Sequence, residues 1–292
     1  LQFCDRALSV DPYLTRALET RALLFLEQGE PDNARQCFLK ATELPDASAS
    51  TYMYLGQISD GADAISFIEK GIAKLLSAAQ MVQSEQAGDL TQLHKDISDG
   101  FVALCDVYLT DLCFEDEAQV MSNKCAHEAI KYGPQNPQAW QTLASVQLSS
   151  SSPELALDSM KKSLSLWYGP LEESSAHLQA ESSSSMDTSG SLDAALILEL
   201  PYEFRLAAAK ILLELKQFET SENILQTLLE EDDEAMQVWY VLGWLHHLQN
   251  EFSLAKEEFA KTLELHAGND GSRSEIVAHI EELFSLQCYQ PL

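Results

Sequence analysis

The chain has 292 residues, and its 46% hydrophobic content is enough for one large domain or two ordinary ones. Its 46 Asp and Glu residues against 18 Lys and Arg residues give a formal charge of -28, which disfavours nucleic acid and anionic lipid and favours a basic protein partner. The six cysteines form no C-x-x-C pair and no apolar run reaches the length of a membrane span, so we expect a soluble, intracellular protein without a metal site.

The chain opens inside a helical pattern. Cys4, Ala7 and Leu8, followed by Pro12, have the spacing expected at the end of the second helix of a helix pair. We therefore expect the natural protein to begin before Leu1.

A helix-pair pattern then recurs along the chain. Its clearest copy starts at the large residue Trp239, continues to the small Gly243 on a first helix, and reaches Ala255, Phe259 and Thr262 on a second helix. Small residues let two antiparallel helices approach, and large ones fill the space to the next pair. Three further copies keep the same interval and start at Leu18, Trp140 and Phe204, while two irregular copies start at Tyr52 and Phe101.

This repetition predicts an all-α fold, a tetratricopeptide-repeat superhelix of about six to seven helix pairs that forms a single domain over 1–292. Residues 274–286 are predicted to be a C-terminal capping helix. Residues 72–96 predict an overlong second helix, a break near Gly88 and the start of the next first helix. Residues 172–191, rich in Ser and Glu, predict a mobile acidic loop.

No catalytic motif accompanies the repeats. The chain has no phosphate-binding glycine loop, no H-E-x-x-H and no G-x-S-x-G, so we expect neither enzymatic activity nor a cofactor. His246 and His247 are neighbours about 100° apart on a helix, which predicts that one packs and one faces outward, and that they share no metal ion.

In this architecture the first helix of each pair lines a groove, chiefly with the residues one and five positions after the large anchor. An acidic N-terminal half with apolar residues and an aromatic C-terminal end predict a groove for an extended basic peptide with apolar anchors. The predicted groove residues are Glu19, Leu23, Met53, Gln57, Val102, Asp106, Gln141, Ser145, Arg205, Ala209, Tyr240 and Trp244, with Glu27, Asp60, Leu109 and His247 one turn further along.

Further acidic residues extend this prediction. The loop from Asp111 to Glu117, with Glu115 and Asp116, is an insertion that the repeat does not require, and such loops often lie at the binding face. Asp99 is a further candidate, with Asp60 and Asp106.

Structural alternatives remain for several of these residues. The acids Asp60, Asp99 and Asp106 could be solvated or cap helices, and Tyr240 and Trp244 could pack between repeats. The run at 230–234 reads as an ordinary solvated turn.

Two other functions are known for repeat superhelices of this kind. A co-chaperone that clamps the acidic C-terminus of a heat-shock protein needs Lys and Asn at the groove positions, where this chain has Glu19, Leu23, Met53 and Gln57, so the sign of the charge is wrong. A scaffold subunit that contacts a larger assembly through its outer face or its ends stays open.

Three segments carry a resemblance to a known family. The stretches 97–119 (ISDGFVALCDVYLTDLCFEDEAQ), 200–215 (LPYEFRLAAAKILLEL) and 238–244 (VWYVLGW) resemble the fungal assembly chaperones of large-subunit ribosomal protein L-four. The resemblance implies a chaperone of the cytoplasm and nucleus that grips the long basic internal loop of newly made L-four, protects it and escorts it to the nucleus. It also implies an import receptor reached through the client, and contact with neither membrane nor nucleic acid.

Overall fold

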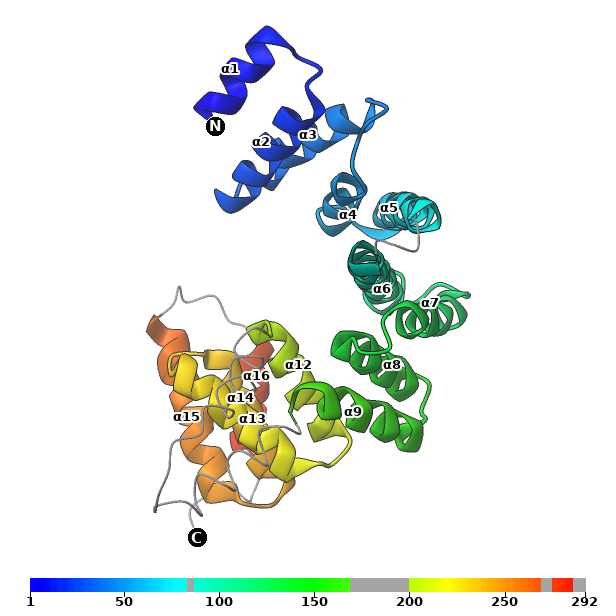
Figure 1. Cartoon of the computed structure of the whole chain (residues 1–292). Helices are drawn as coiled ribbons and strands as arrows, with labels where there is room; N and C mark the ends of the chain where they lie inside the picture. Colours follow the sequence, from blue (N-terminus) through cyan, green and yellow to red (C-terminus); the bar gives the residue numbers. More distant parts are fainter. Residues whose placement is uncertain (83–86, 169–199, 269–274, 286–292) are drawn as a thin grey trace, which may run out of the picture. The chain divides into compact units, whose positions relative to one another are not determined.

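The computed structural model describes residues 1–82, 87–168, 200–268 and 275–285, and within these ranges it contains fourteen helices and no strand (Figure 1). Contacts divide the chain into two compact units, which are described separately here: unit 1 is Leu1–Leu166 and unit 2 is Trp167–Leu292. The single domain over 1–292 stays a prediction, and the acidic loop predicted at 172–191 lies outside the described residues.

Unit 1 is a stack of antiparallel helix pairs that follows a short first helix. In chain order its helices are α1 (Gln2–Val10), α2 (Thr15–Glu27), α3 (Pro31–Thr42), α4 (Ala49–Gln57), α5 (Gly61–Met81), α6 (Ala87–Leu109), α7 (Ala118–Tyr132), α8 (Pro137–Ser149) and α9 (Pro153–Trp167). The four pairs α2–α3, α4–α5, α6–α7 and α8–α9 are the ones that the repeat pattern predicts.

Unit 2 contains two further pairs and a last helix. These helices are α12 (Tyr202–Glu214), α13 (Phe218–Glu231), α14 (Met236–Leu248), α15 (Phe252–Gly268) and α16 (Glu275–Phe284). The last one confirms the capping helix predicted at 274–286. None of the helices in the described part of the chain is both long and apolar enough to cross a membrane.

The small residues of the repeat stand where two helices touch. A Cβ atom added to Gly243 of α14 would lie 2.6 Å from two ring carbons of Phe259 on α15, and one added to Gly56 of α4 would collide with Ile68 of α5. Phe259 and Ile68 are both fully buried. The pattern of small and large residues is therefore a packing requirement, because close-packed interiors have no room for an extra methyl group.

The anchor tryptophans of the two units make the same local bond. Trp140 Nε1 donates to the carbonyl oxygen of Pro134 at 2.9 Å, and Trp239 Nε1 donates to that of Asp233 at 2.8 Å, in each case six residues earlier in the chain. This shared bond closes the turn before each first helix, and it supports the assignment of both helices to one repeat pattern.

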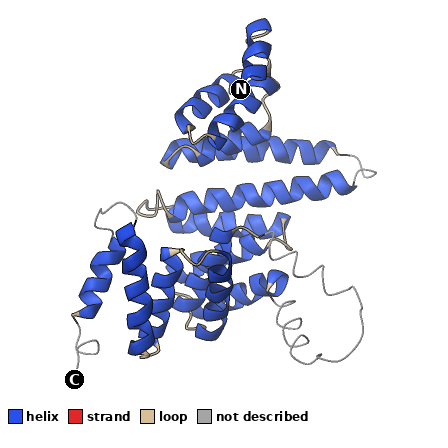
Figure 2. Ribbon diagram, turned by 90° about the vertical axis from the view of Figure 1, so that its left-hand side faces the viewer, coloured by secondary structure: helices blue, strands red, loops and turns tan. Residues whose placement is uncertain are grey.

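The longest helices agree with the prediction for residues 72–96. α5 ends at Met81 and α6 begins at Ala87, one residue before Gly88, so the overlong second helix and the interruption predicted near Gly88 are confirmed. α5 and α6 have 21 and 23 residues and pack against each other as a long hairpin (Figure 2).

Candidate partner-binding surface

The first helices of unit 1 share one side of the stack. Figure 1 shows α4 and α6 on one side and their partners α5 and α7 on the other. We call the open surface of α2, α4, α6 and α8, with the turns at their C-terminal ends, the first-helix face. Its exposed predicted residues are Glu27, Gln57, Asp60, Asp99, Asp106, Asp111, Glu115, Asp116 and Glu117.

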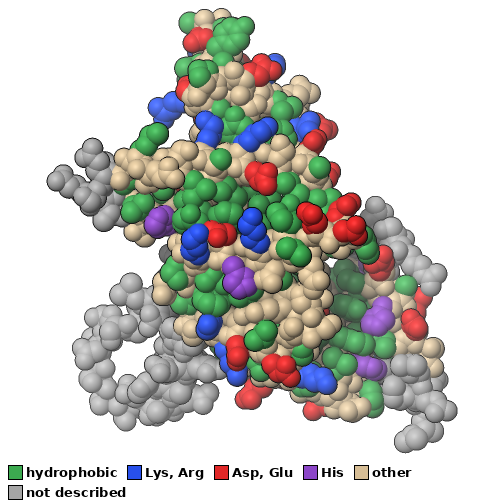
Figure 3. Space-filling view, turned by 90° about the vertical axis from the view of Figure 1, so that its right-hand side faces the viewer, with side chains coloured by type: hydrophobic (Ala, Val, Ile, Leu, Met, Phe, Trp, Pro, Cys, Tyr) green, Lys and Arg blue, Asp and Glu red, His purple; other side chains and the backbone are tan. Residues whose placement is uncertain are grey.

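Charge is distributed unequally between the two kinds of helix in unit 1. The first helices contain three Lys or Arg residues against six Asp or Glu residues, whereas the second helices α3, α5, α7 and α9 contain eight against six. Seen from the side of α5 and α7, hydrophobic side chains form a band with basic and acidic side chains around it (Figure 3). The acidic excess of the first helices lies on α6, since α2 has two acidic and two basic residues and α4 and α8 have neither.

Asp106 stands near the end of α6 and has the most perturbed carboxylate of the first-helix face. Its side chain is exposed to solvent, yet burial of the carboxylate among protein atoms raises its pKa to about 6. A basic side chain placed there would stabilise the ionised form.

Asp99 lies two turns earlier on α6 and is tied to the turn before α8. Asn136 Nδ2 donates to Asp99 Oδ1 at 2.8 Å and to Ser98 Oγ at 2.9 Å, and Ser98 Oγ donates to the carbonyl oxygen of Ala129. Burial raises the pKa of Asp99, while the bond from Asn136 lowers it. Asp99 therefore helps to hold the turn before α8, and its side chain is still exposed to solvent.

Glu19 has a structural role that the sequence did not reveal. Glu19 Oε1 accepts a hydrogen bond from the Ser48 amide at 3.0 Å and a short one from Thr51 Oγ1. Since both donors belong to the start of α4, this carboxylate holds α2 against the next pair.

The apolar residues predicted for the face are half-buried. Leu23 packs on the cluster around Phe38, while Met53 and Leu109 pack on the cluster around Ile68 and Leu104. Each keeps part of its surface open between the acidic residues, and can give a bound chain an apolar contact.

The acidic loop between α6 and α7 is bound to the neighbouring pair. Asp111 Oδ2 accepts a hydrogen bond from the Gly61 amide at 2.9 Å, and Gly61 directly follows Asp60. The structure thus brings Asp60 and Asp111 together, although fifty positions separate Gly61 from Asp111. Glu115, Asp116 and Glu117 follow, all exposed.

Four predicted groove residues lie in the interior instead. Val102 and Gln141 are buried, and Val102 packs with Ala129 and Ala139. These side chains are enclosed between successive pairs because the position after the anchor turns toward the next pair, so their placement on an open groove is corrected. Ser145 is half-buried.

Arg205 and Ala209 of α12 are the other two, and both are buried. Arg205 makes a two-pronged ion pair with Glu231, in which Nη2 lies 2.8 Å from Oε2. The bond from Arg205 lowers the pKa of Glu231. Arg205 therefore joins α12 to the end of α13 and is a structural residue.

The aromatic end of the predicted groove is covered by the capping helix. Tyr240 Oη lies 2.8 Å from His279 Nδ1 of α16, and the ring of Trp244 lies 5.1 Å from those of both His279 and His247. Tyr240, Trp244 and His247 are half-buried. The prediction that the rings of Tyr240 and Trp244 are exposed is corrected: they form the contact of α14 with α16, which is the packing alternative. The ring of His247 lies against those of Trp244 and Phe252.

Of the two neighbouring histidines one is buried, as predicted, while the other, predicted to face outward, is half-buried. His246 is buried, with Nδ1 2.7 Å from Glu258 Oε2, and His247 stacks on Trp244. Burial raises the pKa of Glu258, while its bond to His246 lowers it. Within the described ranges no group of three or more His, Cys, Asp and Glu side chains is arranged to hold a metal ion.

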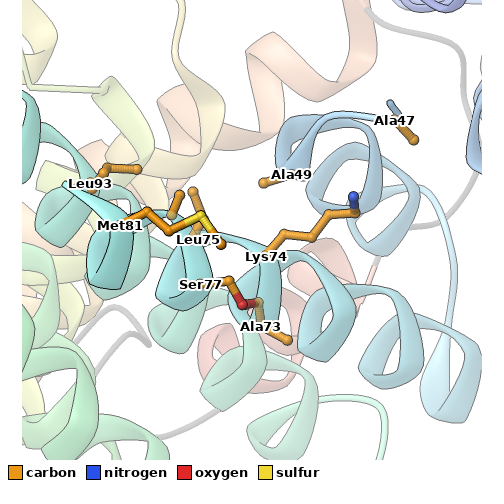
Figure 4. A pocket seen from close by; sticks show the side chains of 9 residues that line it. Ala47, Ala49, Ala73, Lys74, Leu75, Ser77, Met81 and Leu93 are labelled. Carbon is orange, nitrogen blue, oxygen red and sulfur yellow. The ribbon is translucent and has the colours of Figure 1, made fainter. Parts of the chain in front are cut away.

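Unit 1 also has an apolar hollow of about 600 Å³ (Figure 4). It lies between the start of α4, the C-terminal part of α5 and the N-terminal part of α6. Lys74 is its only charged lining residue and extends toward Ala47. This lining suits an apolar side chain of a partner and offers no catalytic group. The lining residues are Ala47, Ala49, Ala73, Lys74, Leu75, Ser77, Ala78, Met81 and Leu93.

Models of the tetratricopeptide repeat match residues 15–48 and 206–270, one stretch in each unit. A solved structure titled "Assembly Chaperone of RpL4 (Acl4) (Residues 1-338)" superposes with a TM-score of 0.66 at 24% identity and covers 85% of this chain and 86% of its own. The Cut9–Hcn1 hetero-tetramer structure gives a TM-score of 0.57 at 9% identity, over 97% of this chain and 45% of that one. The chain is an all-α tetratricopeptide-repeat protein.

Two curated relatives extend the resemblance to the sequence level. Proteins named "Probable assembly chaperone of rpl4" are 27% identical over 260 residues in Schizosaccharomyces pombe and 26% identical over 270 residues in Emericella nidulans. The alignments cover 85% and 88% of this chain, and 69% and 61% of the relatives. The resemblance predicted from three segments is thereby confirmed over most of the chain.

Proposed function

We propose that this chain is an assembly chaperone for ribosomal protein L-four, and that it holds a basic, extended segment of that protein on the first-helix face of unit 1. The observation that carries the proposal is the acidic excess on α6 and in the loop 111–117 that follows it, whereas the second helices of unit 1 carry more Lys and Arg than Asp and Glu. A chain rich in Lys and Arg is attracted to the carboxylates of α6 and its loop more than to the second helices. The names of the curated relatives support the choice of client.

Binding on this face combines two effects. Long-range attraction to the carboxylates raises the association rate, on the order of tenfold or more at low salt. The half-buried Leu23, Met53 and Leu109 give the bound segment apolar contacts that slow its dissociation. Since ordering a flexible segment costs roughly 2–5 kcal/mol, several contacts along the face are needed.

The cellular role follows from the chemistry of the client. A basic segment held against carboxylates is shielded from aggregation and degradation while the complex passes from cytoplasm to nucleus, with the import receptor bound to the client. Phosphates of ribosomal RNA compete for the same Lys and Arg side chains, which favours release during assembly. This role requires binding alone and no catalytic step.

Calorimetric titration with a synthetic peptide of the basic internal loop of L-four tests the proposal. We expect binding that weakens from low to physiological salt and that falls about tenfold or more in Asp106→Lys, which places a cation among the acids of the face. The matched control is Glu69→Lys, which makes the same change of net charge on the exposed surface of α5. We expect the control to stay within about twofold of the wild type.

Two results would contradict the proposal. If both variants weaken binding equally, net charge and not the first-helix face attracts the peptide. If the folded wild type does not bind the peptide, the chaperone function itself is wrong, and a scaffold role through the second-helix side becomes the better interpretation.

A further inference from the structure

Phe114 is the most exposed large hydrophobic side chain in the described part of the chain, with 97% of its surface open. It stands in the loop between α6 and α7. A side chain that folding leaves wholly in water contributes little to stability and is available to a partner.

The loop that carries Phe114 is held by hydrogen bonds on both sides of the ring. Asp111 Oδ2 accepts from the Gly61 amide at 2.9 Å, the Leu112 amide donates to the Val107 carbonyl oxygen at 3.1 Å, and the Glu115 amide donates to that of Leu112 at 2.9 Å. Leu112 is half-buried and lies against the Gly61 position, 3.7 Å from where a Cβ would be. An ordered loop presents the ring at a fixed place, which lowers the entropy cost of using it.

The charges around the ring determine which partner fits. Asp111, Glu115, Asp116 and Glu117 are all exposed, and the sequence has no Lys or Arg between Lys95 and Lys124. A neutral apolar peptide would gain only contact with the ring. An arginine would gain the ring face for its guanidinium and the neighbouring carboxylates for its charge.

The loop continues the first-helix face. It follows Asp106 and Leu109 at the end of α6, and its anchor Gly61 follows Asp60, the N-cap residue of α5 in the turn after α4. A basic segment bound along α6 would therefore reach the ring without leaving the acidic surface.

We propose that Phe114, with the carboxylates of its loop, is an anchor for an arginine side chain of the basic segment that the first-helix face binds. This inference rests on the proposed function and adds to it a residue that repeat positions do not predict. The aromatic anchor for the client is thus in the inserted loop of unit 1 and not among the aromatic residues of α14.

The test compares Phe114→Ala with Phe3→Ala in the same titration with the L-four loop peptide. Phe3 is a matched control because it is 85% exposed but lies on α1, outside the acidic loop. We expect about three- to tenfold weaker binding for Phe114→Ala and no change for Phe3→Ala. Circular dichroism and thermal unfolding should be unchanged in both variants, since neither ring is packed.

A second arm tests the assignment to arginine. The peptide is remade with every Arg replaced by Lys, which keeps its charge but removes the planar guanidinium. We expect the loss caused by Phe114→Ala to shrink to less than about twofold with this peptide.

The outcomes separate the two proposals. Wild-type binding with no loss in Phe114→Ala overturns the anchor and leaves the proposed function standing. An equal loss with the Arg and Lys peptides overturns the arginine assignment. No wild-type binding overturns the proposed function and with it the anchor.

Discussion

Equivalent repeat positions have opposite fates in the two units. Asp106 stands five residues after the anchor Phe101 and is open to solvent, whereas Trp244 stands five residues after the anchor Trp239 and packs against α16. The repeat register is the same, but in unit 2 the capping helix covers the surface that unit 1 leaves open. The position in the repeat thus determines toward which side of the helix pair a side chain points. Whether that side is buried or open to a partner depends on whether another helix packs against it.

The acids are also placed on different helices. In unit 1 the first helices carry the acidic excess, while in unit 2 α14 has no Asp, Glu, Lys or Arg and α13 has four Glu and no base. Over 200–268 and 275–285, the helices of unit 2 therefore do not combine open first helices with carboxylates as α6 of unit 1 does.

The largest expected effect comes from truncating Phe259, which lies in the hydrophobic cluster between α14, α15 and α16. Phe259→Ala leaves a cavity against Gly243 and α16, and we expect it to destabilise unit 2 by about 3–5 kcal/mol. Denaturant unfolding followed by tryptophan fluorescence measures the change. Affinity for the basic peptide should stay near that of the wild type, and a large loss of affinity at a temperature where the protein is folded would contradict the division of roles between the units.

The ion pair of Arg205 provides the next test. Glu231→Ala leaves the buried guanidinium without its carboxylate, and we expect a loss of about 1–3 kcal/mol in the free energy of unfolding. Because the pKa of Glu231 is lowered in the folded state, the pair stabilises above the unfolded-state pKa and the effect should disappear as pH falls through the folded-state pKa. The exposed neighbour is the control: Glu230→Ala should change stability little, and an equal loss there would argue against the ion pair.

A smaller effect is expected from the contact of α14 with α16. Tyr240→Phe removes the hydroxyl group that meets His279, at a cost of about 0.5–1.5 kcal/mol in the free energy of unfolding. Tyr202→Phe is the matched control because Tyr202 Oη is buried without a hydrogen-bond partner among the described residues, so its removal should be neutral or stabilising. Equal losses in both variants would show that the bond to His279 contributes nothing.

The smallest expected effect concerns the pH dependence of binding at Asp106. Since its pKa is raised to about 6, the carboxylate is ionised at pH 7 and increasingly protonated toward pH 5, so affinity for the basic peptide should fall about two- to fivefold over that range. Binding at pH 6 should release protons, measurable by calorimetry in buffers of different ionisation enthalpy. In Asp106→Asn this pH dependence should be reduced, and an unchanged profile would assign it to other groups.

For the same residue, the stability of the free protein should change in the other direction. A folded-state pKa above the ordinary value means that ionisation of Asp106 opposes folding, so stability gains as pH falls through about 6 toward 4. Weaker binding together with a more stable protein at pH 5 distinguishes Asp106 from Glu231, whose pKa is lowered in the folded state.

The helix pairs could be predicted from the sequence, but which side chains are exposed on the first-helix face could not. The small residue at Gly243 and the large one at Phe259 must meet whenever two helices pair, so their spacing predicts the pair from local pattern alone. Whether Val102 faces a groove or the next pair depends on the angle between successive helix pairs. The residue spacing within one pair does not determine this angle. The spacing of Ile276, His279 and Leu283 in the capping helix was the available signal that α16 has an inner face to cover something.

By itself the sequence determined an acidic, all-α repeat protein, its six helix pairs or parts of pairs and its capping helix, because helix periodicity and net charge are properties of the chain. Only the tertiary structure decided that Asp111 joins the turn at Gly61, that the aromatics of α14 lie beneath α16, and that Phe114 is exposed to water. These depend on contacts between residues far apart in the chain, and packing between helices, not the pattern within one, determines which side chains a partner can reach.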